Sequence, residues 1–317
     1  MSQNDLRHNA PPRVLVLLAS YEGHDWIEAQ IGTILSQCNV SISLLVSDDH
    51  SRDGTGALIR SLAATDPRVD VLESTSASGS AGANFRRLLR GADATDFDFV
   101  ALADQDDIWL EDKMFRAIQK LACVNASGYS SSVTAFWRDG RERTLHQNPR
   151  WRTADFLFEG AGQGCTFVLT AEFFRTVQFF CLRHAAQADA LHYHDWLIYL
   201  LARADGRRWI FDSESRIRYR QHESNEIGAR GGIGAALHRL RKIRDGWFRR
   251  QVEAAIDAYV ASNQRHPIVE RFRHLLLPST PRNLTRRFKM AILLSQHSRR
   301  RTSDRMVLVA AALLGWL

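Results

Sequence analysis

The sequence has few cysteines and no long apolar run, and each shortage excludes a class of protein. None of its four cysteines lies at the Cys-x-x-Cys spacing of zinc or thioredoxin-like redox sites, which favours reduced thiols in a cytoplasmic protein. No segment reaches the roughly 18–20 apolar residues that a membrane-spanning helix needs. Residues 1–13 are polar and lack the apolar core of a signal peptide. We therefore expect a cytoplasmic protein, with peripheral contact at the inner membrane left open.

Charge is unevenly distributed along the 317 residues. Residues 1–217 carry 22 basic and 28 acidic side chains, whereas residues 218–317 carry 20 basic and seven acidic ones. Such a basic region suits a phospholipid surface, a lipid-linked phosphate or nucleic acid, and a solvated helical surface explains it equally well. We expect the arginines at 299–301 to lie on a solvated surface of the protein. The apolar run 306–317 fits an interfacial anchor, a helix that packs on the body, or the start of a longer apolar segment.

Apolar strands and amphipathic helices alternate over the first 125 residues. The spacing of apolar residues predicts strands at 14–18, 42–46, 69–72 and 97–103, and helices at 26–37, 54–64, 84–90 and 113–122. Further on, it predicts strands at 131–137, 166–169, 209–211 and 217–219, helices at 172–180 and 196–204, and a mainly helical region from about residue 231. Cys165 reads as part of a strand. This alternation predicts a doubly wound α/β sheet, with ligands beyond the carboxyl ends of its strands.

Three acids follow one apolar strand directly, in the segment Asp104-Gln105-Asp106-Asp107. Carboxylates that close repel one another unless a cation or many hydrogen bonds stabilise them. Oxygen ligands suit Mg²⁺ or Mn²⁺, and Mg²⁺ usually combines one or two protein carboxylates with substrate phosphates. We therefore expect a diphosphate bound together with a metal ion. A helix N-cap, in which Asp107 accepts backbone N–H groups, is the structural alternative.

Two other segments could contact a ligand, one at a strand end and one in a loop of small residues. The segment 47–55 places Asp48 and Asp49 after a strand, where a carboxylate can accept a hydrogen bond from a base N–H or a ribose hydroxyl. A capped turn explains Asp53 and Gly54 well, but explains the two preceding acids poorly. The small residues at 79–84 would let the backbone approach a ligand closely, and a plain loop explains them equally well.

The segments 19–23, 47–55 and 103–109 together resemble the family 2 glycosyltransferases. The sequence from Asp104 to Trp109 resembles the bacterial rhamnosyltransferase-type branch in particular. The resemblance covers roughly residues 12–228. It implies the GT-A nucleotide-diphosphosugar transferase fold, a doubly wound mixed sheet. It also implies an inverting, metal-dependent transfer of a sugar from a nucleotide donor. The residues themselves predict that the remaining region, 229–317, is basic and helical and possibly associates with a membrane.

The resemblance assigns roles to particular residues on the donor side. The residues expected to bind the nucleotide sugar are Ser20, Tyr21, Glu22, Asp48, Asp49, Asn84, Asp104, Gln105 and Arg220. The expected ligands of Mg²⁺ or Mn²⁺ are Asp104, Asp106 and His222. Arg220 and His222 belong to the segment 219–225, which is similar to the closing motif of the rhamnosyltransferase-type branch.

On the acceptor side, the family usually carries its general base as an acid before a helix, and Asp195 matches that position. Many members have a second acid just before the base, where this chain has His194. The alternative for Asp195 is a first-turn acid favoured by the helix dipole. The residues expected to bind the acceptor are Gly164, Cys165, Thr166, His194 and Trp196. The Gln-x-x-Arg-Trp motif of processive members is absent, which favours single additions.

The resemblance favours L-rhamnose from dTDP-rhamnose as the donor sugar, and a cell-surface glycan or lipid-linked molecule as acceptor. A UDP-hexose is the alternative donor, because no composition or spacing identifies the sugar. A nucleotidyltransferase is a further class, but its basic triphosphate loop is missing where residues 21–25 are acidic. A noncatalytic sugar- or nucleic-acid-binding module would suit the basic region, but no nucleic-acid-binding motif is present, so no nucleic acid is expected.

Overall fold

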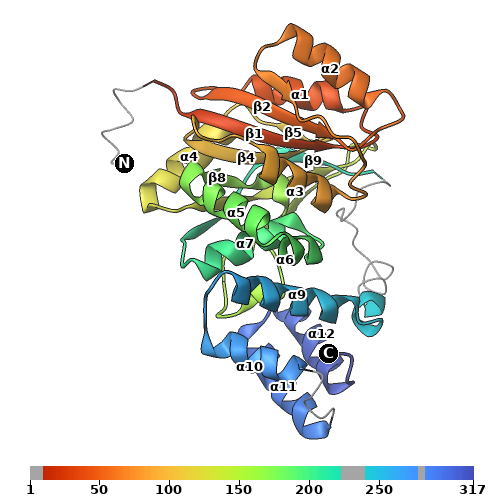
Figure 1. Cartoon of the computed structure of the whole chain (residues 1–317). Coiled ribbons are helices and arrows are strands. Elements are labelled where there is room, and N and C mark those ends of the chain that lie inside the picture. The colour runs from red at the N-terminus through yellow and green to blue at the C-terminus, as the bar shows by residue number, and fades with distance from the viewer. Residues whose placement is uncertain (1–9, 223–239, 278–282) are drawn as a thin grey trace.

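A mixed β-sheet with helices on both faces forms one part of the molecule, and C-terminal helices lie beyond one of its helical layers (Figure 1). The computed structural model describes residues 10–222, 240–277 and 283–317. The strands are β1 (Arg13–Ser20), β2 (Ser41–Asp48), β3 (Val69–Val71), β4 (Phe99–Asp104), β5 (Ile108–Trp109), β6 (Gly128–Phe136), β7 (Glu142–Leu145), β8 (Val168–Thr170) and β9 (Trp209–Arg220).

The helices in the sheet-containing part are α1 (Ile27–Leu35), α2 (Thr55–Thr65), α3 (Ala81–Gly91), α4 (Lys113–Val124), α5 (Ala171–Arg183), α6 (Ala185–Ala190) and α7 (His194–Ala204). The C-terminal helices are α9 (Trp247–Ala261), α10 (Pro267–Leu276), α11 (Leu284–His297) and α12 (Thr302–Leu313). Two short 3₁₀ turns matter for the site, η2 (Asp155–Leu157) and η3 (Gly164–Thr166).

The sheet follows the order β3-β2-β1-β4-β8-β6-β9-β5, with β7 paired to β6. Strands β1 to β4 pair in parallel, while β8 runs antiparallel between β4 and β6. Strands β6 and β9 are parallel to each other, and the register places their carboxyl ends at the same edge as those of β1, β2 and β4. The segments that end in polar residues therefore meet at one edge of the sheet.

Alternation along β1 explains why the sheet is covered on both faces. Leu15 and Leu17 face the side of α3, α5 and α7, and every second residue points that way. Val14 and Val16 face the opposite side, where α1 and α4 pack. A strand buried on both faces reads as a continuous apolar run, which is why β1 and β4 are evident in the sequence.

The elements predicted for residues 14–122 are present, with their ends shifted by a few residues. Two predictions are wrong further along. Cys165 lies in the turn η3 rather than in a strand, and the two short strands predicted at 209–211 and 217–219 form one strand, β9. The polar residues between them remain in the sheet because Asp212 accepts hydrogen bonds from Tyr129 and Lys120, both at 2.7 Å. Register shifts opposite Ser132 absorb the irregularity.

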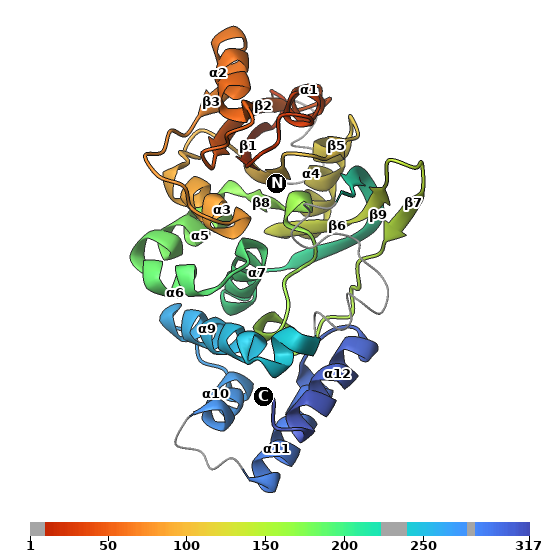
Figure 2. The ribbon, with the colours of Figure 1, turned by 90° about the vertical axis from the view of Figure 1, so that its right-hand side faces the viewer.

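The C-terminal helices share a hydrophobic core with the layer formed by α3, α5 and α7. Helix α9 packs against α6, α7 and η2, and α11 and α12 pack side by side (Figure 2). The prediction that the region from about residue 231 is helical is confirmed for its described part. The boundary between residues 228 and 229 stays a prediction, since it falls outside the described ranges. Within those ranges, no helix has the length and apolar character needed to cross a bilayer.

A buried ionic network joins the C-terminal helices to the sheet-containing part. The fully buried carboxylate of Asp155 accepts hydrogen bonds from Tyr199 at 2.9 Å, Arg203 at 2.5 Å and Arg300 at 3.4 Å. Arg300 also pairs with Glu159 and is only 7% exposed. The expectation that residues 299–301 form solvated surface is therefore wrong for Arg300. A buried arginine needs such partners because an unpaired charge is costly inside a protein.

Replacing Asp155 by asparagine should lower the free energy of unfolding by about 3 kcal/mol, because it leaves buried guanidinium charges without their carboxylate. Urea unfolding of the purified protein measures this change. The matched control is Asp139→Asn, which removes an exposed carboxylate paired with Arg141 and should change stability little. Equal effects of the two substitutions would contradict the role of the buried network.

Candidate active site

The carboxyl ends of β1, β2 and β4 bring the donor-side residues together. Ser20 lies opposite Asp48 in the parallel register of β1 and β2, and Ala19 lies opposite Asp104 across β1 and β4. The Ser20 hydroxyl donates a hydrogen bond to Asp48 at 2.9 Å. Three strand ends thus present polar side chains at one place, as the sequence predicted.

Gln105 holds the loop after β1 in position. Its side-chain amide accepts a hydrogen bond from the Tyr21 backbone N–H at 2.7 Å and donates one to the Tyr21 carbonyl at 2.8 Å. A Cβ on Gly23 would lie 2.2 Å from the Gln105 side chain, so a larger residue there would displace the Gln105 amide from the Tyr21 backbone. The loop leaves the Tyr21 side chain 58% exposed at the rim of the site. Glu22, with φ at 50°, accepts a hydrogen bond from the Arg52 backbone N–H.

Asp48 and Asp49 have different surroundings. Asp48 is half-buried, accepts the Ser51 hydroxyl at 2.6 Å, and lines a hollow of about 330 Å³ beside α2. Asp49 is buried, accepts the backbone N–H groups of Ser78 and Gly79, and pairs with Arg87 at 3.2 Å. Burial alone would raise the pKa of Asp49, but these hydrogen bonds and Arg87 lower it below its ordinary value. Asp49 therefore anchors the loop before α3.

Asn84 connects the start of α3 to the sheet. Its amide donates to the carbonyl oxygens of Ser20 and Ser47, and accepts the Ser47 hydroxyl at 2.7 Å. The side chain is buried behind the strand ends. In this structure Asn84 orders the backbone of the site, and direct contact with a nucleotide stays a prediction.

The end of β9 closes over the acidic segment. The Asp106 carboxylate lies 2.6 Å from Nε2 of His222, whose ring stacks on Trp26 with centroids 4.3 Å apart. Arg220 donates a hydrogen bond from its side chain to the Asp106 carbonyl at 2.9 Å. The structure therefore brings Asp106, His222 and Arg220 together, although they are more than 100 positions apart in the sequence. Residues 223–225 of the predicted closing motif lie outside the described ranges.

Asp107 forms the floor beneath these residues. Burial, and then the neighbouring charges of Asp106 and Asp104, raise the pKa of Asp107 well above its ordinary value. Burial also raises the pKa of the Cys165 thiol and lowers that of Lys113 to about 7. The Lys113 ammonium sits 3.4 Å above the ring of Trp109. A mostly neutral layer thus lies beneath the edge of the sheet that carries Asp104 and Asp106, here called the acidic edge.

Sequence reasoning missed Lys113 as a part of this floor. A signal was present, because Lys113 occupies a position on the otherwise apolar face of α4, together with Met114 and Ala117. A lysine on a buried face needs a reason, and here the ring of Trp109 provides a cation–π contact and Asp107 lies nearby. The sequence alone could not reveal that Cys165 lies beside them.

The described residues include one trio of possible metal ligands at this edge. One ligand atom each from Asp104, Asp107 and Cys165 lies within 4.8 Å of the other two. A thiol with a raised pKa stays protonated and is a poor ligand for Mg²⁺ or Mn²⁺, which prefer oxygen. Among the described residues, the predicted ligands Asp104, Asp106 and His222 do not form such a trio, although Asp106 and His222 are in contact. Their role as metal ligands stays a prediction.

The acceptor-side residues meet where α7 begins. A Cβ on Gly164 would lie 3.4 Å from Cβ of Asp195, and one on Gly160 would lie 3.2 Å from the backbone nitrogen of Trp196. The loop from 160 to 164 therefore packs directly on the first turn of α7. Asp195 is half-buried, and its carboxylate accepts the Trp196 backbone N–H at 2.7 Å.

The neighbours of Asp195 are buried and shape the wall of the site. His194 stacks on Phe85 with ring centroids 3.8 Å apart, and burial with a smaller contribution from Arg86 lowers its pKa to about 3. Trp196 is buried and donates a hydrogen bond to the Phe156 carbonyl at 2.7 Å. Thr166 is also buried. These side chains support Asp195, and their predicted contacts with an acceptor remain untested.

The turn η3 links the two halves of the site. Gly164 abuts Asp195, while the next residue, Cys165, lies against Asp104 and Asp107. The candidate base and the acidic edge therefore flank two consecutive residues.

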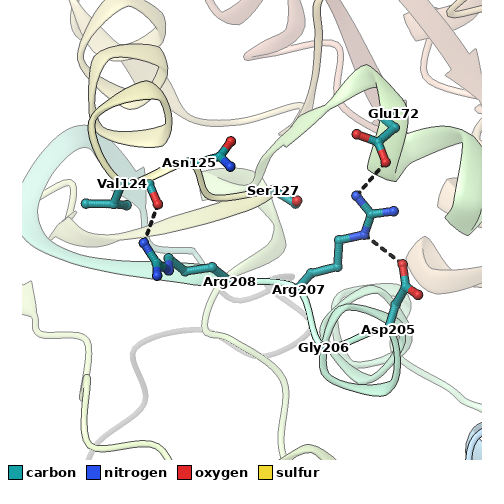
Figure 3. Close-up of a pocket in the computed structure, with 8 residues that line it drawn as sticks. All are labelled: Val124, Asn125, Ser127, Glu172, Asp205, Gly206, Arg207 and Arg208. Atoms are coloured by element: carbon teal, nitrogen blue, oxygen red, sulfur yellow. Dashed lines mark hydrogen bonds and ion pairs between the residues drawn. The ribbon is translucent and has the colours of Figure 1, made fainter. Parts of the chain in front are cut away.

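Another hollow, of about 530 Å³, lies at the opposite edge of the sheet (Figure 3). Its Arg207 pairs with Asp205 and Glu172, and Arg208 donates a hydrogen bond to the Val124 carbonyl. It lies near the amino ends of β6 and β9, far from the acidic edge. Its arginines already have partners, so it adds nothing to the candidate site.

The mixed sheet and the acids at its carboxyl edge define a GT-A glycosyltransferase fold. S. aureus TarS 1–349 in complex with UDP-GlcNAc is a solved structure similar to this chain, with a TM-score of 0.54 and 12% identity over 96% of this chain and 89% of that one. A mannosyltransferase from Pyrobaculum calidifontis, in complex with GDP-Man and Mn²⁺, is also similar, with a TM-score of 0.50 and 17% identity. The match covers 96% of this chain and 87% of that one. The predicted fold is confirmed.

Sequence comparison gives the family. Residues 16–182 match the model of glycosyl transferase family 2. The dTDP-rhamnosyl transferase RfbG of Shigella flexneri is 36% identical over 242 residues, which are 76% of this chain and 84% of RfbG. The glucosyltransferase WfgD of Escherichia coli is 32% identical over 114 residues, 36% of this chain and 43% of WfgD. The chain belongs to glycosyl transferase family 2 and is a glycosyltransferase.

The depressed pKa of His194 predicts how stability depends on pH. As the pH falls below 6.5, the unfolded chain protonates this histidine while the folded protein keeps it neutral down to about pH 3, so stability is lost across that window. His194→Gln should therefore flatten the fall of the unfolding free energy between these values, by up to about 1.4 kcal/mol per pH unit. Urea unfolding at a series of pH values measures how the unfolding free energy of wild type and of the variant depends on pH. The same dependence in both proteins would show that His194 is not held neutral.

Proposed function

We propose that this enzyme transfers L-rhamnose, with inversion, from dTDP-rhamnose to a lipid-linked or cell-surface glycan acceptor. The observation that carries the proposal is the convergence on η3, where the acidic edge and Asp195 flank Gly164 and Cys165. The name of RfbG, a dTDP-rhamnosyl transferase similar to this chain over most of both lengths, supports the donor. A UDP-hexose is the second candidate, because WfgD is named as a UDP-Glc-dependent enzyme.

Donor binding would use the edge formed by β1, β2 and β4. The exposed ring of Tyr21 and the half-buried carboxylate of Asp48 suit the nucleoside, one by stacking and the other by hydrogen bonding. Asp104 and Arg220 would contact the diphosphate. The remaining predicted donor residues, Ser20, Glu22, Asp49, Asn84 and Gln105, hold the loops that carry these groups.

Asp104, Asp106 and His222 would hold Mg²⁺ or Mn²⁺. A divalent cation supplies charge neutralisation for the diphosphate that leaves. The pairing of Asp106 with His222 at 2.6 Å keeps that carboxylate oriented, and the largely neutral floor below it limits the charge that the cation must balance. The mannosyltransferase neighbour is in complex with Mn²⁺, which supports a metal requirement.

Asp195 would act as the general base. The acceptor hydroxyl oxygen attacks the anomeric carbon, the bond from that carbon to the diphosphate breaks, and the nucleoside diphosphate leaves with the bonding electrons. The hydroxyl proton passes to the Asp195 carboxylate. Attack opposite the leaving group inverts the anomeric centre. His194 stays neutral beside the base, so it places no charge there that would hold the carboxylate in an ion pair.

The purified enzyme should hydrolyse dTDP-rhamnose faster than UDP-glucose, and only with Mg²⁺ or Mn²⁺ present. Release of the nucleoside diphosphate, followed by chromatography, measures both reactions across a panel of nucleotide sugars. Asp106→Asn should lower the rate on the order of 100-fold, because it removes a proposed ligand of the cation that neutralises the leaving diphosphate. Asp112→Asn, which removes a carboxylate paired with Arg116, is the matched control and should leave the rate unchanged.

Faster hydrolysis of UDP-glucose would contradict dTDP-rhamnose as the donor and support the second candidate, a UDP-hexose. A metal-independent rate, or near-normal turnover by the Asp106 variant, would remove the metal assignment while leaving the family unchanged.

Asp195→Asn should leave donor binding intact and reduce sugar transfer by roughly 10²- to 10⁴-fold, because it removes the proton acceptor without changing the shape of the side chain. Calorimetric titration with the nucleoside diphosphate measures binding, and transfer to an acceptor is followed separately. Asp205→Asn, at the other end of α7, is the control expected to behave as wild type. Normal transfer by the Asp195 variant would rule this residue out as the base.

A further inference from the structure

Helices α11 and α12 expose apolar side chains on their outer faces. These residues, here called the hairpin patch, are Leu284, Phe288 and Ile292 of α11 with Met306, Val307, Leu313 and Leu314 at the end of the chain. Each is between 40% and 68% exposed. The spacing of four within α11, and of seven between the pairs 306–307 and 313–314, places each set on one side of its helix.

The two sets lie next to each other at one end of the helix pair. Arg287, within the first turns of α11, donates a hydrogen bond to the Leu313 carbonyl at 3.4 Å, and its guanidinium lies against Gly315. The start of α11 is therefore beside the end of α12, as both ribbon views show (Figures 1 and 2). Leu284 and Phe288 thus lie near Leu313 and Leu314, remote from the sheet.

The hairpin patch is not the core face of either helix. Met290 and Leu294 of α11, and Leu308 and Ala312 of α12, already lie in the hydrophobic core. A surface helix normally presents a polar face to water once its apolar side is buried. Two neighbouring helices with apolar residues on both sides indicate that the outer side contacts something other than water.

Charge decides between the candidate partners. Residues 283–317 contain seven arginines and lysines and a single acid, Asp304. Arg286, Arg300 and Arg305 are buried, so four of the seven cations reach the surface. Two copies of this surface would repel each other, whereas an anionic surface would attract it. Lys289 is exposed beside the apolar residues of α11, and Arg301 is exposed at the start of α12. Apolar side chains bordered by cations are the features of a helix that lies in the plane of a lipid headgroup layer.

We propose that the hairpin patch docks on the surface of an anionic lipid bilayer, with α11 and α12 lying in its headgroup region. This binding is separate from sugar transfer and does not depend on the donor. The helix pair is joined to the acceptor side of the site, because His297 accepts the Ala154 backbone N–H at 3.1 Å and Arg300 donates to the Gly160 carbonyl. Docking would therefore fix the orientation of the acceptor side relative to the membrane.

Sedimentation of the full chain with lipid vesicles tests the proposal. Wild type should bind phosphatidylcholine vesicles that contain phosphatidylglycerol, bind pure phosphatidylcholine vesicles less, and bind more weakly at high salt. The double variant Leu284→Gln with Phe288→Gln should bind about tenfold more weakly, because two apolar side chains no longer enter the lipid. The matched control is Phe179→Gln with Leu182→Gln on α5, whose side chains are 66% and 58% exposed and which should bind like wild type.

A second variant, Met306→Gln with Leu314→Gln, guards against misfolding of the first and should lose binding similarly. Sedimentation velocity without lipid, and donor hydrolysis without lipid, should be unchanged in all variants. Equal vesicle binding by the patch variants and the α5 control would overturn the proposal. A wild-type dimer that the patch variants dissociate would instead assign the patch to a second copy of the chain.

Discussion

Repulsion among the three carboxylates after β4 is the constraint on which the site depends. Each of them is accommodated in a different way. Asp107 is buried, and its raised pKa favours the neutral form. Asp106 is paired with His222, and Asp104 stands half-buried at the edge of the sheet. This separation leaves negative charge only where a cation and a diphosphate would meet it, and explains why a strand can end in so many acids without unfolding.

The surrounding polar residues fall into two groups that a sequence pattern cannot separate. One group forms hydrogen bonds with backbone groups of neighbouring segments and so sets the shape of the edge. Its members are Gln105, Asn84 and Asp49. Tyr21 and Asp48 retain surface toward the solvent. A sequence motif contains residues that hold the loops as well as residues that contact the ligand, because a change in the loop geometry would disturb the site as much as the loss of a ligand contact.

Continuous apolar runs made the sheet and its acidic edge predictable, because strands buried on both faces carry an unambiguous signal. The full extent of β9 was not predictable, since the polar residues around Asp212 are kept in the sheet by Tyr129 and Lys120 from other elements. Arg300 gave a similar difficulty. Its burial depends on Asp155, 145 positions away, and nothing local distinguishes it from an arginine on solvated surface.

The link between the C-terminal helices and η2 changes how the basic region should be understood. Arg300 reaches the Gly160 carbonyl, and Gly160 packs on the first turn of α7, where Asp195 begins the acceptor side. A rigid connection of this kind means that any surface holding α11 and α12 also fixes the direction in which the proposed base faces. An acceptor confined to that same surface would meet the enzyme at a raised effective concentration and in a limited set of orientations. The basic, apolar C-terminal region and the acidic edge of the sheet would then act on the two substrates separately, one orienting the enzyme toward the acceptor and the other binding the donor.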